Sequence, residues 1–297
     1  METLPHIQVR EPFGKINYWR QPDGTVKIRA YILGEHIREG AQTGVAIQAS
    51  NSMRSAFGFT GWQKLLGRRA GLNAMSLMAQ KMCSYLARKV DADSRTLAIY
   101  WATGARGAQV EQIGHLAAFQ AERHDFAGPR RFGPTAHLLP AVRHLVDQFV
   151  DANWGMYVFL TDGRFRDLEA VKQYSSQLAR EIATGQRNDL KLVMVGLGQR
   201  IDESTMRQLD DLNTGTGLDL WDHKLAVGMR SLMEIFAEVV DENRIVAEGG
   251  VVRDSFGNIV KDFKDCGVPS LMTFTIPAGS KTFTLESTVG VVTQSIP

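Results

Sequence analysis

Cysteine is scarce in this chain of 297 residues, which contains only Cys83 and Cys266. Two cysteines in a chain of this length cannot form the disulfide framework of a small secreted domain, so a reducing cytosol is the expected environment. A surplus of charge is missing too, because 34 basic and 32 acidic residues leave a formal net charge of +2. A nearly balanced chain has no dominant electrostatic partner, and nucleic acid is therefore an unlikely one.

Three further patterns are missing from the sequence. No run of apolar residues approaches the length that crosses a membrane, so we expect no membrane partner. The first residues, Met1 to Pro5, lack the basic start and apolar run of a signal peptide. We find no Gly-x-Ser-x-Gly, no His-Glu-x-x-His and no plausible Cys/His pairing. These absences predict a cytoplasmic protein that is not an enzyme.

Both ends of the chain have the patterning of β-structure. Near the N-terminus, two partly alternating segments flank Asp23-Gly24, which is a strong turn pair. Near the C-terminus, the segments 271–276 and 282–285 flank Pro277-Ala278-Gly279-Ser280 in the same way. We therefore expect one β-sandwich built from residues 1–42 and 244–297, with a second domain, residues 43–243, inserted between them.

The middle of the chain alternates between expected strands and helices. Short buried runs such as 96–101 and 191–198 predict strands, whereas apolar residues at helical spacing predict helices over 72–90, 167–184 and 226–240. This order predicts an α/β fold with a doubly wound, mostly parallel sheet flanked by helices, vWA-like or Rossmann-like, to which the terminal β-sandwich is an appendage.

Hydroxyl and carboxylate side chains follow two of the expected strands. Ser50 and Ser52 come directly after the apolar run 44–47, and Asp162 ends the run 156–160. Thr135 lies in a Gly/Pro turn before an expected helix. Ligands of open α/β sheets bind beyond the carboxyl ends of the strands, and oxygen ligands suit Mg²⁺ or Ca²⁺. Taken alone, Ser50 and Ser52 could equally be a turn and a helix N-cap.

The three segments, in this order, resemble the von Willebrand factor A (vWA) family and its metal-ion-dependent adhesion site. The resemblance covers roughly residues 43–243 and rests on Ser50, Ser52, Thr135 and Asp162. It implies that these four bind the metal, and that Gln48, Asn51, Gly163 and Arg164 support them or contact a partner. It also implies the mostly bacterial, intracellular branch of that family.

One position departs from the family pattern. Gln48 stands where the family has its first Asp, and an amide carries no negative charge. Because metal affinity of oxygen sites rises with the number of carboxylates, we expect Mg²⁺ or Ca²⁺ to bind weakly or not at all. The expected site is a degenerate one.

The resemblance implies a function in protein–protein interaction. An acidic residue of another protein would dock at the adhesion site, with AAA+ ATPases, kinases or phosphatases as partners in a bacterial stress or defence system. A metal-assisted hydrolase and a Ro-like or Ku-like nucleic-acid-binding protein are the alternatives. Function has to be argued from the site rather than from the fold, so the placement of these side chains decides between them.

Overall fold

The computed structural model describes residues 2–5, 8–32, 40–59, 71–198, 200–226, 245–288 and 290–297. They form two compact units, one made of Met1–His36 with Met229–Pro297 and the other of Ile37–Gly228. The boundaries expected from the sequence, after residues 42 and 243, stay a prediction. The helix expected over 226–240 lies almost wholly outside the described residues. None of the described helices has the length and apolar character needed to cross a membrane.

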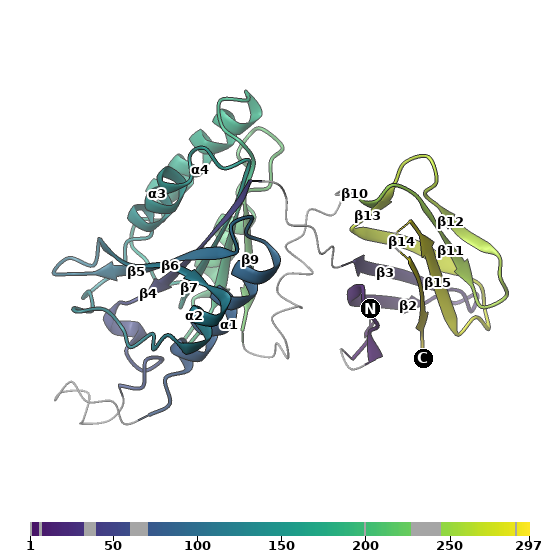
Figure 1. Ribbon diagram of the computed structural model, residues 1–297, viewed down its shortest axis with the longest axis horizontal. Coiled ribbons are helices and arrows are strands. Elements are labelled where there is room, and N and C mark those ends of the chain that lie inside the picture. Colours follow the sequence, from purple (N-terminus) through teal and green to yellow (C-terminus); the bar gives the residue numbers. More distant parts are fainter. Residues whose placement is uncertain are drawn as a thin grey trace. The chain divides into compact units, whose positions relative to one another are not determined.

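The first unit, referred to below as unit 1, contains antiparallel strands from both ends of the chain (Figure 1). Its strands are β1 (Glu2–Thr3), β2 (Phe13–Arg20), β3 (Val26–Ile32), β10 (Ile245–Ala247), β11 (Gly250–Asp254), β12 (Ile259–Asp262), β13 (Val268–Pro269), β14 (Leu271–Ile276), β15 (Thr282–Ser287) and β16 (Gly290–Ser295). One sheet has the order β1-β2-β3-β14, a second has the order β12-β11-β15-β16, and β10 pairs with β13.

Strand β3 joins the two ends of the chain, because it pairs with β14 from Val26 opposite Ile276 to Tyr31 opposite Leu271. Alternate residues of these strands are buried, as is typical of a sheet that packs on a core through one face. Phe283 of β15 is fully buried, and its ring centroid lies 5.4 Å from that of Phe13 and 5.0 Å from that of Phe274. The two four-stranded sheets therefore share one hydrophobic core.

The second unit, unit 2, contains a six-stranded sheet and all the described α-helices. Its strands are β4 (Ala41–Gln48), β5 (Arg95–Thr103), β6 (Gln109–Ala117), β7 (Trp154–Thr161), β8 (Leu190–Gly196) and β9 (Trp221–Leu225), in the order β6-β5-β4-β7-β8-β9. Strand β6 is antiparallel to β5, and the other neighbouring pairs are parallel. Its helices are α1 (Ala74–Lys89), α2 (Ala118–Arg123), α3 (Leu139–Gln148), α4 (Leu168–Ala183) and α5 (Glu203–Asp210).

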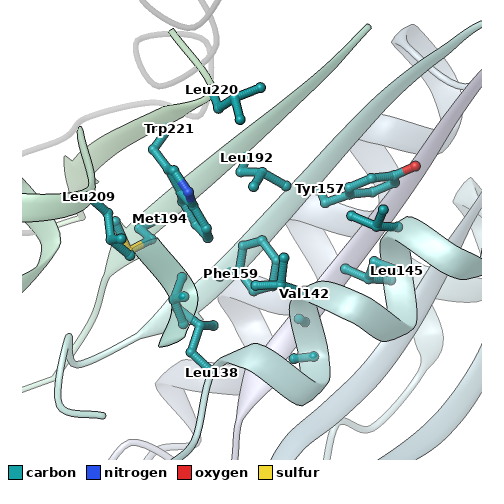
Figure 2. Close-up of a cluster of buried hydrophobic side chains, with 14 of the residues drawn as sticks. Leu138, Val142, Leu145, Tyr157, Phe159, Leu192, Met194, Leu209, Leu220 and Trp221 are labelled. Carbon is teal, nitrogen blue, oxygen red and sulfur yellow. The ribbon is translucent and has the colours of Figure 1, made fainter. Parts of the chain in front are cut away.

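The sheet of unit 2 is buried on both faces, which explains why its central strands are almost continuously apolar. Helices α3 and α4 lie on one face, and α1 and α2 lie on the other (Figure 1). On the α3 side, Trp221 and Phe159 from the sheet meet Leu145 and Leu209 from the helices (Figure 2). The indole nitrogen of Trp221 donates a hydrogen bond of 2.8 Å to Ser175 Oγ, so this core also satisfies its buried polar group.

The fold class expected for the chain, α/β with a β-sandwich appendage, is corrected by the structure. Strands account for 37% and helices for only 24%, and the described strands form four separate sheets. The chain is therefore mostly β. The physical reason is that the alternating segments at both ends are long enough to build their own antiparallel sheets and core, while helices are confined to unit 2.

Candidate functional site

The parallel strands β4 and β7 bring two of the expected site segments to the same edge of the sheet. Their register places Ile47 opposite Leu160, so Gln48 and Thr161 both lie at the carboxyl ends. Beyond β4 the chain enters a short 3-10 turn, Asn51–Met53, which contains Ser52. Side chains from both strand ends therefore meet where ligands of such sheets bind.

Gln48 is the centre of a buried polar cluster. Its side chain is fully buried, and its amide nitrogen Nε2 donates hydrogen bonds of 2.9 Å to Ser50 Oγ and of 2.9 Å to Asp162 Oδ1. Its carbonyl oxygen Oε1 accepts from Thr161 Oγ1 and, at 3.1 Å, from the backbone N–H of Asp162. We call Gln48, Ser50, Ser52, Thr161 and Asp162 the edge cluster.

The chemistry of its neighbours fixes the orientation of the Gln48 amide. The backbone N–H of Asp162 is a donor only, so the atom that faces it has to be Oε1. An ionised carboxylate is an acceptor only, so the atom that faces Asp162 Oδ1 has to be Nε2. Both contacts agree, and a flipped amide would set donor against donor and acceptor against acceptor.

The edge cluster reaches solvent through one hydroxyl and one carboxylate oxygen. Ser50 Oγ lies 2.8 Å from Ser52 Oγ, and Ser52 is exposed. Asp162 Oδ1 also accepts a 3.0 Å hydrogen bond from the backbone N–H of Arg164, whereas Asp162 Oδ2 accepts none from the residues that the structure describes. Oδ2 and the Ser52 hydroxyl are therefore the atoms that this cluster offers to a ligand.

Thr135 does not join the edge cluster. Its hydroxyl donates a 3.1 Å hydrogen bond to the carbonyl oxygen of Arg106, in the turn between β5 and β6. The loop that carries it is nevertheless close by, because Asn51 N donates to Gly133 O at 2.8 Å. Of the expected site residues, the structure brings together Gln48, Ser50, Ser52 and Asp162.

The expected supporting residues act through their backbone. Asn51 is exposed and anchors the neighbouring loop as described, and the Arg164 N–H binds Asp162 while its side chain is exposed. Gly163 has a φ of +76°, and a Cβ there would come within 2.4 Å of the carbonyl oxygen of Asp202. A side chain at that position would push the loops after β7 and β8 apart.

The floor beside the edge cluster is a close packing of backbones. The N–H of Gly133 lies 3.1 Å from both Ala49 O and Ala102 O. Ala102 has a φ of +58°, which is uncommon for a residue with a side chain. A Cβ on Gly107 would lie 1.9 Å from the carbonyl oxygen of Thr135. The three loops are therefore held in one arrangement before any ligand binds.

Exposed arginines surround the edge cluster on three loops of the same edge. We call Arg106, Arg130, Arg131, Arg164 and Arg166 the arginine rim. Backbone contacts place these loops together, because Gly104 N donates to Arg131 O at 3.1 Å and Arg166 N donates to Ala136 O at 3.0 Å. A nearby acid, Asp167, is committed to the backbone N–H groups of Leu138 and Leu139. The edge is thus locally basic in a nearly neutral chain.

The donor set of the edge cluster does not fit Mg²⁺ or Ca²⁺. Among the described residues there is no group of three or more His, Cys, Asp or Glu side chains that could hold a metal. Asp162 is the one carboxylate of the cluster, and the Nε2 hydrogens of Gln48 point at two of the oxygens that a cation would need. Since hard cations require several oxygen ligands with free lone pairs, this geometry disfavours them.

Two parts of the site escaped the sequence analysis. Thr161 was not singled out, although its buried hydroxyl donates to Gln48 and accepts from Gly163 N at 2.9 Å. The left-handed conformation of Ala102 has no sequence signal at all, because alanine seldom adopts it. A Thr at the end of a long apolar run, one residue before the Asp, was the available clue to the first.

No family model and no curated protein matches the sequence. Two solved structures are similar to the chain at low identity. The PilB minor pilin from Streptococcus sanguinis is 11% identical with a TM-score of 0.43, over 75% of this chain and 76% of that one. The pilus adhesin SpaC from Lactobacillus rhamnosus GG, in an open conformation, is 10% identical with a TM-score of 0.39. This chain is covered to 96% but spans only 47% of the adhesin.

These comparisons correct several expectations from the sequence. The resemblance to the vWA family is not supported, because no family model matches and the similar structures are a minor pilin and a pilus adhesin. The intracellular adaptor function, its hydrolase and nucleic-acid alternatives and the cytoplasmic location fall with it, since these structures are pilus components. At such identities and TM-scores the likeness carries no argument about what this chain does, so we assign no location.

Proposed function

We propose that unit 2 binds another protein at the carboxyl edge of its six-stranded sheet, and that the bound group is an acidic side chain of the partner. The observation that carries the proposal is the edge cluster, whose exposed end, Ser52 Oγ and Asp162 Oδ2, is surrounded by the arginine rim. A hydroxyl can donate to a carboxylate, and guanidinium groups bind carboxylates through two parallel N–H···O bonds.

The charges at this edge favour an acid in spite of Asp162. Two unit charges 4 Å apart interact by about 1 kcal/mol in water, so several arginines outweigh one carboxylate at similar distances. Asp162 is only 3% exposed, and its Oδ1 is already occupied by the Gln48 amide and the Arg164 N–H. The loops are also held by backbone contacts, so little conformational freedom is lost on binding.

The proposal concerns binding rather than catalysis. The expectation that the chain is not an enzyme stays a prediction, and it agrees with an edge cluster whose hydroxyls contact each other and an amide rather than a general base. Nucleic acid and membrane stay unlikely partners on the grounds of the nearly balanced composition and the absence of long apolar runs.

A peptide-display selection tests the proposal without knowledge of the natural partner. Random peptides are selected on the immobilised chain and then compared on the Ser52→Glu variant, which adds a negative charge at the exposed end of the edge cluster. The Gln186→Glu variant is the matched control, because it adds the same charge at an exposed position that precedes β8, at the amino edge of the sheet.

We expect selected peptides rich in Asp and Glu that bind the wild type and Gln186→Glu alike and lose at least tenfold in affinity on Ser52→Glu, which corresponds to about 1.4 kcal/mol. Peptides without acidic enrichment, or peptides that bind Ser52→Glu as well as the wild type, would refute the proposed binding face.

A further inference from the structure

We propose that the Gln48 side-chain amide takes the structural place of a cation, so that the carboxyl edge of unit 2 is assembled and binds its acidic partner without any metal. This inference rests on the proposed function for the identity of the partner, but the claim about assembly concerns the edge cluster alone. The starting observation is that Gln48 bridges the oxygens of two different strand ends, Ser50 Oγ after β4 and Asp162 Oδ1 after β7.

The bridge performs what a bound cation would otherwise perform at this place. A cation would hold the serine and aspartate oxygens together by drawing on their lone pairs. Nε2 of Gln48 does the same with two hydrogens, at 2.9 Å from each oxygen. The amide carries only partial positive charge on this side, and a single carboxylate needs no more than that together with the Arg164 N–H.

The amide cannot turn aside to admit a metal at low cost. Its Oε1 accepts from Thr161 Oγ1 and from the Asp162 N–H, and the whole side chain is buried. Entry of a cation between the two oxygens would break the two Nε2 hydrogen bonds and turn Nε2 toward groups that need an acceptor. Buried donors without a partner are costly, so the hydrogen-bonded arrangement is the stable one.

The arginine rim supplies the positive charge that attracts the partner. Because its five arginines are exposed, their attraction is screened by salt over a distance of about 8 Å at physiological ionic strength. Binding at this edge is therefore sensitive to salt and insensitive to chelators, whereas a metal-bridged contact would have the opposite dependence on EDTA.

The first experiment measures thermal unfolding of the wild type, Gln48→Glu and Gln42→Glu in EDTA, in excess MgCl₂ and in excess CaCl₂. Gln48→Glu keeps the shape of the side chain but replaces the two N–H donors by a carboxylate beside Asp162. Gln42→Glu is the matched control, because Gln42 lies on the same strand and its Nε2 donates to Asp93 Oδ2 at 2.8 Å, in an exposed position.

We expect the melting temperature of the wild type and of Gln42→Glu to be the same with EDTA, Mg²⁺ or Ca²⁺. We expect Gln48→Glu to melt lower in EDTA and to regain stability when either cation is added, because two carboxylates then share the ion. If Gln48→Glu does not fold, isothermal titration of the wild type with each cation decides the point. A cation-dependent rise in the wild-type melting temperature, or measurable cation binding in that titration, would overturn the inference.

The second experiment uses the acidic peptide that binds best in the display selection. Its affinity for the wild type should be unchanged by EDTA, should fall at least tenfold when NaCl is raised from low to physiological concentration, and should not be outcompeted by single-stranded DNA. Binding that needs Mg²⁺ or Ca²⁺, or displacement by DNA, contradicts the metal-free recognition of an acidic protein. Failure to select any peptide that distinguishes Ser52→Glu contradicts the proposed function instead, and the melting experiment still judges the assembly.

Discussion

Replacing Gln48 by leucine is the sharpest test of the edge cluster, because leucine keeps much of the volume and removes every hydrogen bond of the amide. Four hydrogen bonds are lost, two donated by Nε2 and two accepted by Oε1. The fully buried position leaves no room for bulk water to replace them. The variant therefore isolates the polar contribution of this one side chain.

The size of the effect follows from the partners that remain. Asp162 Oδ1 keeps the Arg164 N–H, and Ser50 Oγ keeps the Ser52 hydroxyl. The Thr161 hydroxyl hydrogen and the Asp162 N–H lose the acceptor that Gln48 provided. An unsatisfied buried donor costs about 1–3 kcal/mol, so Gln48→Leu should lower the free energy of unfolding of unit 2 by about 2–6 kcal/mol.

Chemical denaturation followed by tryptophan fluorescence measures this loss. The Trp19→Phe background removes the signal of unit 1, because Trp101, Trp154 and Trp221 belong to unit 2 and Trp19 lies in β2. Gln42→Leu, on the exposed start of the same strand, is the control and should cost less than about 1 kcal/mol. A loss for Gln48→Leu no larger than that of the control would refute the hydrogen-bond network as the link between β4 and β7.

Further predictions concern the core, the titration and the backbone of the two units. Phe283→Ala should destabilise unit 1 by about 3–5 kcal/mol, and a double-mutant cycle with Phe13→Ala should show coupling, since the two rings are in contact in a shared core; simple additivity of the two losses would argue against it. Burial raises the pKa of Asp222 from its ordinary value of 3.8, so its carboxyl favours the folded state below about pH 4 and loses that contribution as the pH rises through the raised value. Asp222→Asn should therefore gain stability relative to the wild type over that pH window, and a difference that does not change with pH would contradict this. Gly107→Ala should lower the melting temperature of unit 2 strongly, because its Cβ would overlap the Thr135 carbonyl at a φ of +66°; an unchanged melting temperature would show that the loop can shift freely.

Individual elements of unit 2 were predictable from the sequence because their patterns are long and regular. The run 96–101 lies within β5, the run 191–198 overlaps β8, and the helix expected over 72–90 corresponds to α1. Buried parallel strands are apolar along their whole length, so they are easy to find. The short helix α2 was missed, since six residues carry too little periodicity.

The fold class and the site were harder, for physical reasons. The class of the chain depends on how the terminal strands associate, and a register such as that of β3 with β14 links residues far apart in sequence. Gln48 was expected to weaken a metal site by loss of charge, but which atoms its amide contacts depends on the neighbouring strand end. Thr135 shares the loop of Gly133 but turns to Arg106, and no spacing rule predicts the direction of one hydroxyl.

Hydrogen exchange of the chain with and without a selected acidic peptide tests the central claim most directly. Peptide binding should slow amide exchange in the loops that form the carboxyl edge of the six-stranded sheet, residues 49–54, 104–107, 131–136 and 162–166, in EDTA as well as in Mg²⁺. The amino edge of the same sheet and the sheets of unit 1 should exchange at unchanged rates. Protection confined to unit 1 or to the amino edge, or protection that appears only when a divalent cation is present, would contradict the account.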